Sequence, residues 1–241
     1  MRGGGCANRA TIGRNPKRVL LSSSGHVHLF FTGTGTNVGK THAACRWVAR
    51  LREQGTPAIG LKPISAGDRD DAEKLRAAAR DALSLDEINP VHLPSPMAPW
   101  AASAILGKAG HEIDFAKLNG SIRTSLARFS HVAVEGVGGW RVPLAEGITV
   151  GEWAEELGLP VVIVAPAGLG AINQVLLTLE SVERSGLSIL GVILNPHGAP
   201  PSEALATNRA ALARWTGKPV IELTAEGDFP TNGAEWLFGS L

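Results

Sequence analysis

Several features that would assign a protein to a special class are scarce in this 241-residue chain. It has two cysteines, Cys6 and Cys45, which argues against a disulfide framework and fits a reducing cytoplasm. No run of about twenty apolar residues occurs, so the sequence offers no candidate membrane span. The seven histidines have no metal-ligand spacing, and no Ser/His/Asp or Cys/His arrangement stands out.

A large excess of one charge is also absent. The chain has 23 Lys and Arg residues against 22 Asp and Glu residues. Without a strong field of one sign, we expect neither nucleic acid nor an anionic membrane to be the main partner. Hydrophobic residues make up 44% of the sequence, which fits a globular protein long enough to bury a full core.

Residues 1–25 differ in composition from the rest. They contain five basic residues, no acidic residue, and no apolar stretch suited to a secretory signal. We expect a flexible extension, or residues that precede the true start of the protein. An organelle transit segment is the alternative, because such segments are also basic and poor in acids.

From His26 onward, strand-like and helix-like segments alternate. The expected strands are Val27–Phe31, Ala58–Leu61, Val132–Glu135, Val161–Ala165, Ile189–Leu194 and Val220–Leu223. The expected helices are Lys40–Glu53, Asp71–Leu83, Phe115–Phe129, Val150–Leu157, Ile172–Arg184 and Pro201–Trp215, with a proline-rich loop at Asn89–Pro99 followed by a short Ala-rich helix. This alternation predicts an α/β fold with a doubly wound, mostly parallel sheet and helices on both faces.

The segment Gly33–Thr41 is the most informative part of the chain. It lies between an apolar strand and a helix that begins with Lys40-Thr41, the architecture of a phosphate-binding loop (P-loop). Five residues separate Gly33 from Gly39, one more than the usual four. Thr34 and Thr36 could donate to phosphates or cap the helix. The expected ATP-binding residues here are Gly35, Thr36, Asn37, Val38, Gly39, Lys40 and Thr41, of which Thr41 would hold Mg²⁺. We therefore expect one P-loop NTPase-like domain over residues 26–241.

Lys62 and a nearby acidic cluster follow the second strand. Pro63 favours an extended backbone at Lys62, which would direct this lysine to the sheet edge where the P-loop lies. There it would stabilise charge on a transferring phosphoryl group, although a solvated surface lysine is equally compatible with the sequence. Of Asp68, Asp70 and Asp71, one or two would complete a Mg²⁺ site, and the others would be ordinary acids at a helix start.

Glu135 ends another strand and precedes the glycine-rich segment Gly136–Gly139. A carboxylate at a strand end, followed by glycines that allow a ligand close to the backbone, predicts a second Mg²⁺ ligand and a substrate platform. Further along, Leu169–Asn173 opens a helix whose free N–H groups would suit a carboxylate, although an ordinary helix start explains this segment equally well.

Together these segments resemble the dethiobiotin synthetase family over roughly His26 to Trp215. The family's loop, Gly-Thr-x-Thr-x-Val-Gly-Lys-Thr, matches Gly33–Thr41 with its extra residue included. The family's Lys-Pro, Asp-Ala, Val-Glu-Gly-Ala-Gly-Gly and Leu-Gly-x-Ile-Asn motifs resemble Lys62-Pro63, Asp71-Ala72, Val134–Gly139 and Leu169–Asn173. Asn195 fits the family's adenine-recognising asparagine.

The resemblance implies an ATP- and Mg²⁺-dependent ring closure of 7,8-diaminononanoate with CO₂ or bicarbonate as the carbon source. A substrate amine takes up CO₂ as a carbamate, and the carbamate attacks the γ-phosphate to form a carbamic–phosphoric anhydride. The second amine then closes the ureido ring of dethiobiotin, and phosphate leaves.

The family's residue roles transfer by position. Catalytic roles fall to Lys40, Lys62 and Thr36, metal binding to Thr41, Asp71 and Glu135, and ATP contacts also to Glu135, Gly138 and Asn195. Substrate contacts fall to Lys62, Ser65, Gly138, Gly139, Ala171, Ile172 and Asn173. The last three would act across a homodimer, at the partner's site. In the family a Ser or Thr precedes the glycine after Lys-Pro; here Ala66 stands there, with Ser65 one place earlier.

Three other functions share parts of this pattern. A partner-regulated ATPase switch would carry an extra lysine five residues before Lys40, where this chain has Gly35. A glutamine-dependent amidase of the cobyrinate type would need a glutaminase domain for which 241 residues leave no room. A paralogue that binds nucleotide without turnover remains as the third alternative.

Overall fold

The computed structural model describes residues 25–105, 107, 112–196 and 202–238; the expected extension lies outside these residues except for Gly25. The main sheet consists of β1 (Val27–Gly33), β2 (Ala58–Leu61), β5 (His131–Glu135), β8 (Val161–Pro166), β9 (Ile189–Asn195) and β10 (Val220–Glu222). These six strands have the order β10-β9-β8-β1-β5-β2. Every neighbouring pair is parallel, as expected from the near-continuous apolar runs.

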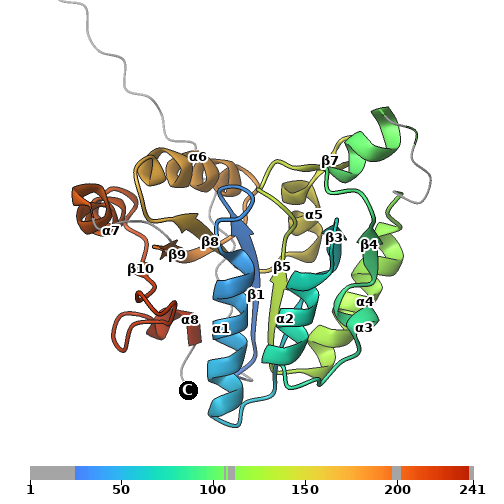
Figure 1. Cartoon of the computed structure of the whole chain (residues 1–241), viewed down its shortest axis with the longest axis horizontal. Coiled ribbons are helices and arrows are strands. Elements are labelled where there is room, and N and C mark those ends of the chain that lie inside the picture. The colour runs from blue at the N-terminus through green and yellow to red at the C-terminus, as the bar shows by residue number, and fades with distance from the viewer. Residues whose placement is uncertain (1–24, 106, 108–111, 197–201, 239–241) are drawn as a thin grey trace, which may run out of the picture.

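Helices cover both faces of this sheet, as the sequence predicted. The longer ones are α1 (Lys40–Glu53), α2 (Asp70–Ala78), α4 (Phe115–Arg128), α5 (Val150–Leu157), α6 (Ala171–Arg184) and α7 (Glu203–Thr216). The short ones are α3 (Leu85–Ile88), α8 (Glu235–Phe238) and a π-helical turn at Ala101–Ile105. In Figure 1, α1 and α2 lie in front of the sheet and α5 lies behind it. Within the described ranges, no helix is long and apolar enough to cross a membrane.

The sheet and α1 show why these residues form these elements. All residues of Val161–Ala165 are buried, which suits a strand covered on both faces. In α1, Ala43, Ala44, Trp47, Val48 and Leu51 are fully buried at helical spacing, so one stripe of the helix packs on the sheet. The core contains residues from β1 through α8. It fixes the strand ends that carry the polar residues discussed below.

The strand order reverses at β1. From β1 the chain first builds β2 and β5 on one side, then β8, β9 and β10 on the other. In parallel α/β sheets, ligands bind beyond the carboxyl ends of the strands at such a switch point. The register pairs Phe31 of β1 with Glu135 of β5, which places Glu135 beside the start of the glycine loop.

One predicted helix was too long. The sequence pattern suggested Asp71–Leu83, but α2 ends at Ala78. Arg80 and Asp81 both adopt positive φ values, 55° and 54°, which a helix cannot continue through. The Asp81 N–H donates to the Arg76 carbonyl over 3.0 Å, and the two side chains form an ion pair. This six-residue hydrogen bond closes the helix end, as in a Schellman turn.

Two small strand pairs were not predicted. β3 (Ile64–Ala66) pairs in parallel with β4 (Val91–Leu93), inside a region expected to be loop, and β6 (Pro143–Ala145) pairs antiparallel with β7 (Ile148–Thr149). Each strand has two or three residues, too few to show alternation in the sequence. The β3–β4 pair bears on the predicted site, because β3 begins two residues after Lys62 and contains Ser65.

Candidate active site

The glycine loop between β1 and α1 is shaped by its backbone. Gly39 precedes α1 with φ 96°, and Asn37 has φ 58°. A Cβ atom at Gly39 would lie 2.0 Å from Nδ2 of Asn195, so only glycine fits there. No side chain caps α1, so Thr36 does not fulfil the capping alternative. The first N–H groups of the helix are therefore available to an anion.

Lys40 begins α1 and is 6% exposed. Its ammonium donates to the Gly35 carbonyl over 3.0 Å, which folds the side chain back along the loop. Burial lowers the pKa of Lys40 to about 8, although attraction by Glu135 opposes this shift. A buried cation with one backbone partner is poised to bind an anion that enters the loop.

Lys62 and two carboxylates form the centre of the site. The Lys62 ammonium contacts Asp71 Oδ2 at 2.9 Å and forms a hydrogen-bonded ion pair with Glu135 Oε1. The Thr41 hydroxyl donates to the same Glu135 oxygen over 2.8 Å. Lys62 is 4% exposed, so the alternative of a solvated surface lysine is wrong. Residues from α1, α2 and the ends of β2 and β5 thus meet at one point.

The contact between Lys62 and Asp71 favours the charged form of both groups. Burial opposes the charged form of Lys62, but attraction and hydrogen bonds from Glu135 and Asp71 outweigh burial and raise the pKa of Lys62. Burial would likewise raise the pKa of Asp71, and the contact with Lys62 outweighs it and lowers that pKa. An ammonium thus stays charged beside the phosphate loop.

The donor set fits a hard divalent cation. Oε2 of Glu135 is buried and has no hydrogen-bond partner in the described structure, which leaves one carboxylate oxygen available for a ligand. The Thr41 hydroxyl bonds to the other oxygen of Glu135, and its hydrogen bond with Asp71 adds to the lowering of the Asp71 pKa. No cluster of three or more His, Cys, Asp or Glu side chains suited to a metal occurs among the described residues. Two carboxylates and a hydroxyl, completed by water and phosphate oxygens, match Mg²⁺.

A cavity of about 580 Å³ opens over these groups. Ten sequence-predicted residues line it: Thr36, Asn37, Gly39, Lys40, Thr41, Lys62, Ser65, Asp71, Glu135 and Gly138. Asp68 and Asp70 line it as well, together with Lys74, one helical turn beyond Asp71. Its size suits a drug-sized ligand and its lining is polar, as phosphate-binding sites require.

The remaining predicted residues lie outside the cavity wall. Gly35 and Val38 belong to the loop backbone, and an added Cβ on Gly139 would lie 3.4 Å from Gly35 Cα. Asn195, at the end of β9, donates to the Val38 carbonyl over 3.2 Å and so braces the loop. The predicted trio Ala171, Ile172 and Asn173 belongs to the first turn of α6 and does not line this chain's own cavity, although Gln174 of the same turn accepts from Thr34 of the glycine loop over 3.5 Å.

Sequence reasoning missed Asn89, which follows α3 and is 2% exposed. Its side chain accepts from Ser65 Oγ over 2.9 Å and donates to the Lys62 carbonyl over 2.7 Å. The only sequence signal is an Asn-Pro pair, which ordinarily indicates a turn. It also missed Lys74, for which helical spacing from Asp71 was the available signal.

Comparison with known proteins agrees with this geometry. A family model described as an AAA domain matches residues 28–224. The chain is 41% identical to the ATP-dependent dethiobiotin synthetase BioD of Anaeromyxobacter dehalogenans over 199 residues, covering 81% of this chain and 88% of the relative. It is 38% identical to the protein of that name from Akkermansia muciniphila, covering 79% and 88%.

Solved structures support the fold. The septum site-determining protein MinD of Pyrococcus horikoshii, solved with Mg-ADP, matches with a TM-score of 0.53 at 16% identity, covering 87% of this chain and 88% of that one. The cell division protein FtsY of Thermotoga maritima matches with a TM-score of 0.52 at 15% identity, covering 89% and 69%. The fold is therefore that of the P-loop NTPases. The relatives, matched at moderate identity over most of their length, show that the chain belongs to the ATP-dependent dethiobiotin synthetase family of enzymes.

Proposed function

We propose that this enzyme carboxylates 7,8-diaminononanoate with CO₂ and closes the ureido ring, forming dethiobiotin, ADP and phosphate. The observation that carries the proposal is the charged Lys62 between Asp71 and Glu135, beside Lys40 and the P-loop. Hydrolysis of a nucleotide needs an activated water, whereas two buried ammonium groups beside one phosphate loop suit an anionic nucleophile such as a carbamate.

The phosphate end of ATP occupies the loop in this proposal. Backbone N–H groups from Gly35 to Gly39 and the start of α1 bind the phosphates, and Lys40 exchanges its contact with Gly35 for the β- and γ-phosphates. Thr41, Asp71 and Glu135 would hold Mg²⁺, which would supply charge neutralisation on the phosphate oxygens. Asn195, beside the loop, contributes to recognition of adenine, and Glu135 and Gly138 lie within reach of the nucleotide.

The reaction follows in three bond-forming steps. One substrate amine attacks the carbon of CO₂ and loses a proton, which gives the carbamate. The carbamate oxygen attacks the γ-phosphorus, the bond to the β-phosphate oxygen breaks, and ADP leaves. The second amine attacks the carbamoyl carbon, loses a proton, and displaces phosphate. Lys40 and Lys62 stabilise the charge that builds on the phosphoryl group and the carbamate, with Thr36 and the backbone of Gly138 and Gly139 as further donors. Ser65 contacts the substrate end of the carbamate.

The substrate carboxylate is bound across a homodimer in this proposal. The first turn of α6, which includes Ala171, Ile172 and Asn173, does not line its own cavity. No side chain caps this turn, and the N–H groups of Ile172 and Asn173 would meet the carboxylate, whereas the Ala171 N–H donates to the Gly168 carbonyl over 3.2 Å. Leu169, beside it, is 94% exposed, and Ile172 is 36% exposed. A second subunit that covers these residues would bring α6 to the partner's cavity. The cytoplasm, as a reducing compartment, is the expected location for this chain with two cysteines.

The test is a coupled assay of ADP release. We expect release to require both bicarbonate and the diamine, and Lys40→Ala to abolish it, whereas Lys117→Ala on α4 should leave turnover unchanged. Comparison of ATP, GTP and CTP defines the nucleotide preference. Equal ADP release without the diamine would replace the proposal with an ATPase switch. Tight nucleotide binding without any turnover would indicate a paralogue that only binds.

A further inference from the structure

Asn89 is hydrogen-bonded to the segment that contains Lys62 and Ser65. Its amide nitrogen donates to the Lys62 carbonyl over 2.7 Å and to the Val91 carbonyl over 3.2 Å. Its Oδ1 accepts from Ser65 Oγ and from Arg69 Nε, each over 2.9 Å. Backbone carbonyls only accept and Arg69 Nε only donates, so these partners fix the orientation of the amide. Every hydrogen bond that the buried amide group can make is used.

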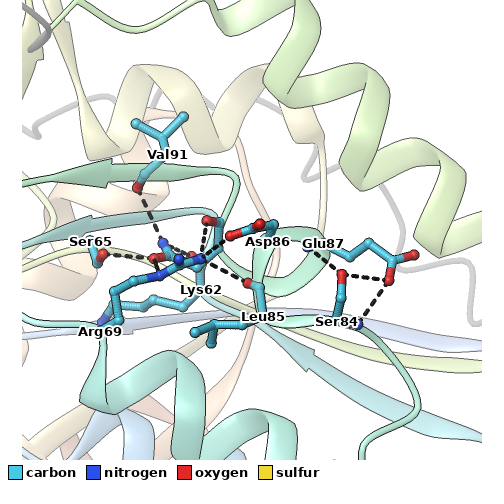
Figure 2. Close-up of polar contacts among 9 residues, drawn as sticks. Lys62, Ser65, Arg69, Ser84, Leu85, Asp86, Glu87 and Val91 are labelled. Atoms are coloured by element: carbon cyan, nitrogen blue, oxygen red, sulfur yellow. Dashed lines mark hydrogen bonds and ion pairs between the residues drawn. The ribbon is translucent and has the colours of Figure 1, made fainter.

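Arg69 locks this arrangement from the protein surface. Its guanidinium donates to the carbonyls of Leu85 and Asn89 over 3.1 and 3.0 Å and pairs with Asp86 over 2.9 Å. Figure 2 shows Arg69 reaching across from the start of α2 toward Ser65, Leu85 and Asp86. The planar fork of an arginine can hold several acceptors at once in a fixed direction, which a lysine cannot.

These contacts form one continuous network that joins Arg69 to both the main chain and the side chain of Lys62. Arg69 is the residue before α2, and Asp71, two positions later, binds the Lys62 ammonium. The backbone of Lys62 is held in turn by Asn89 and by the Ile88 carbonyl, which accepts from Lys62 N–H over 3.0 Å. The main chain and the side chain of Lys62 are thus fixed by neighbouring parts of one network.

We infer that Asn89 and Arg69 are positioning residues for the phosphoryl-transfer site, acting through Lys62 and Ser65; this inference rests on the proposed function. Because the Ser65 hydroxyl hydrogen points to Asn89, its lone pairs are what it presents to the cavity. Ser65 therefore accepts a hydrogen bond from a substrate N–H and does not donate to an anionic oxygen. This polarity selects a nitrogen-bearing substrate group near Lys62.

The test compares Arg69→Met with Arg76→Met. Both variants remove an arginine of the α2 region that pairs with an aspartate, Asp86 or Asp81, but only Arg69 contacts Asn89. In Arg69→Met we expect diamine-dependent kcat to fall by about tenfold or more, as for other supporting residues of active sites. ATP affinity should stay within about twofold, because the P-loop is untouched. Arg76→Met should match the wild type.

A second readout does not depend on turnover. Hydrogen exchange of the amides of Lys62 and Gly67, bonded to Ile88 and Leu93, should become faster in Arg69→Met and stay unchanged in Arg76→Met. Unchanged exchange and unchanged kcat would overturn the inference, and so would an equal loss of ATP affinity and kcat. An inactive wild type would instead contradict the proposed function, and exchange alone would then decide whether Arg69 orders this segment.

Discussion

Lys40 and Lys62 are two buried lysines of one site whose pKa values shift in opposite directions. Lys40 has one backbone carbonyl as a partner, and burial lowers its pKa to about 8. Lys62 lies between two carboxylates, which raise its pKa despite its burial. In the absence of phosphate, Lys40 is therefore a destabilising charge, whereas Lys62 is part of an ion network that stabilises the fold.

This difference predicts opposite effects of the same substitution. The pKa of Lys40 falls from 10.5 to about 8 on folding, so the unfolded chain binds more protons between these values and stability rises with pH across that window. Lys40→Met removes the penalty of burying the charge. We expect its unfolding free energy at neutral pH to exceed that of the wild type by about 3 kcal/mol, and its pH dependence between 8 and 10.5 to be flatter.

Lys62→Met is the matched comparison. It leaves Glu135 buried without its cation, so we expect stability to fall by about 3 kcal/mol. Denaturant unfolding of both variants and the wild type, without nucleotide, measures these free energies of unfolding. Equal destabilisation by the two substitutions would contradict the assigned electrostatics, since it would mean that Lys40 has a stabilising partner as Lys62 does.

At the residue scale, patterns at strand ends predicted the cluster well. Lys62, Asp71 and Glu135 were expected at one edge of the sheet, and the structure brings them into contact. Asn89 could not be foreseen, because its role depends on tertiary neighbours from two other segments. A buried amide leaves no periodic signal in a sequence.

The amino-terminal ends of β1 and β5 carry a pair of histidines at the edge of the sheet opposite the active site. His28 is half-buried on β1, and His131 is buried on β5. Burial lowers the pKa of both, that of His28 to about 4, and His26 adds to the effect in each case. Both imidazoles are therefore neutral in the folded protein at neutral pH.

We predict acid lability from these strands. Below pH 6.5 the unfolded chain protonates His28 and the folded chain does not until about pH 4, so stability falls as the pH drops through this window. His28→Leu should lose less stability between pH 7 and 5 than the wild type does. Thermal unfolding across these pH values measures the effect. If the stability of the two proteins fell equally between pH 7 and pH 5, His28 would have no part in the acid lability.

The length of an element largely decided whether the sequence predicted it. The long apolar strands and amphipathic helices were predicted, because five or more residues establish a period, and the shorter β2 and β10 were predicted from short apolar runs. The ends of α2 and the strands β3 and β4 were not, because left-handed Arg80 and a three-residue pairing depend on contacts distant in sequence. The missed pair contains Ser65, so the least predictable elements support the proposed substrate end of the site.

For the whole molecule, the proposed homodimer predicts a site shared between two subunits. The exposed apolar residues of the α6 region, Leu169, Ile172 and Leu177, are 94%, 36% and 60% exposed in the single chain. We expect Leu169→Lys to shift sedimentation from dimer toward monomer and to raise the KM for the diamine. Its binding of ADP should stay unchanged, because the loop that binds phosphate belongs to one chain.

Mixing two inactive proteins sharpens this prediction. Lys40→Met disables the loop but keeps α6, and Ile172→Asp disables α6 but keeps the loop. If the two regions meet across an interface, mixed dimers contain one intact site, and activity returns on mixing. Failure of the mixture to regain activity, while both variants form dimers, would place the whole site within one chain.

The most direct test of the central claim follows the carbon and the phosphate in one reaction. The enzyme is incubated with ATP, Mg²⁺, the diamine and ¹³C-bicarbonate, and the products are identified by mass. We expect dethiobiotin that carries the label, with one ADP and one phosphate formed for each dethiobiotin, and no labelled product from Lys62→Met. Release of ADP and phosphate without labelled dethiobiotin would contradict it.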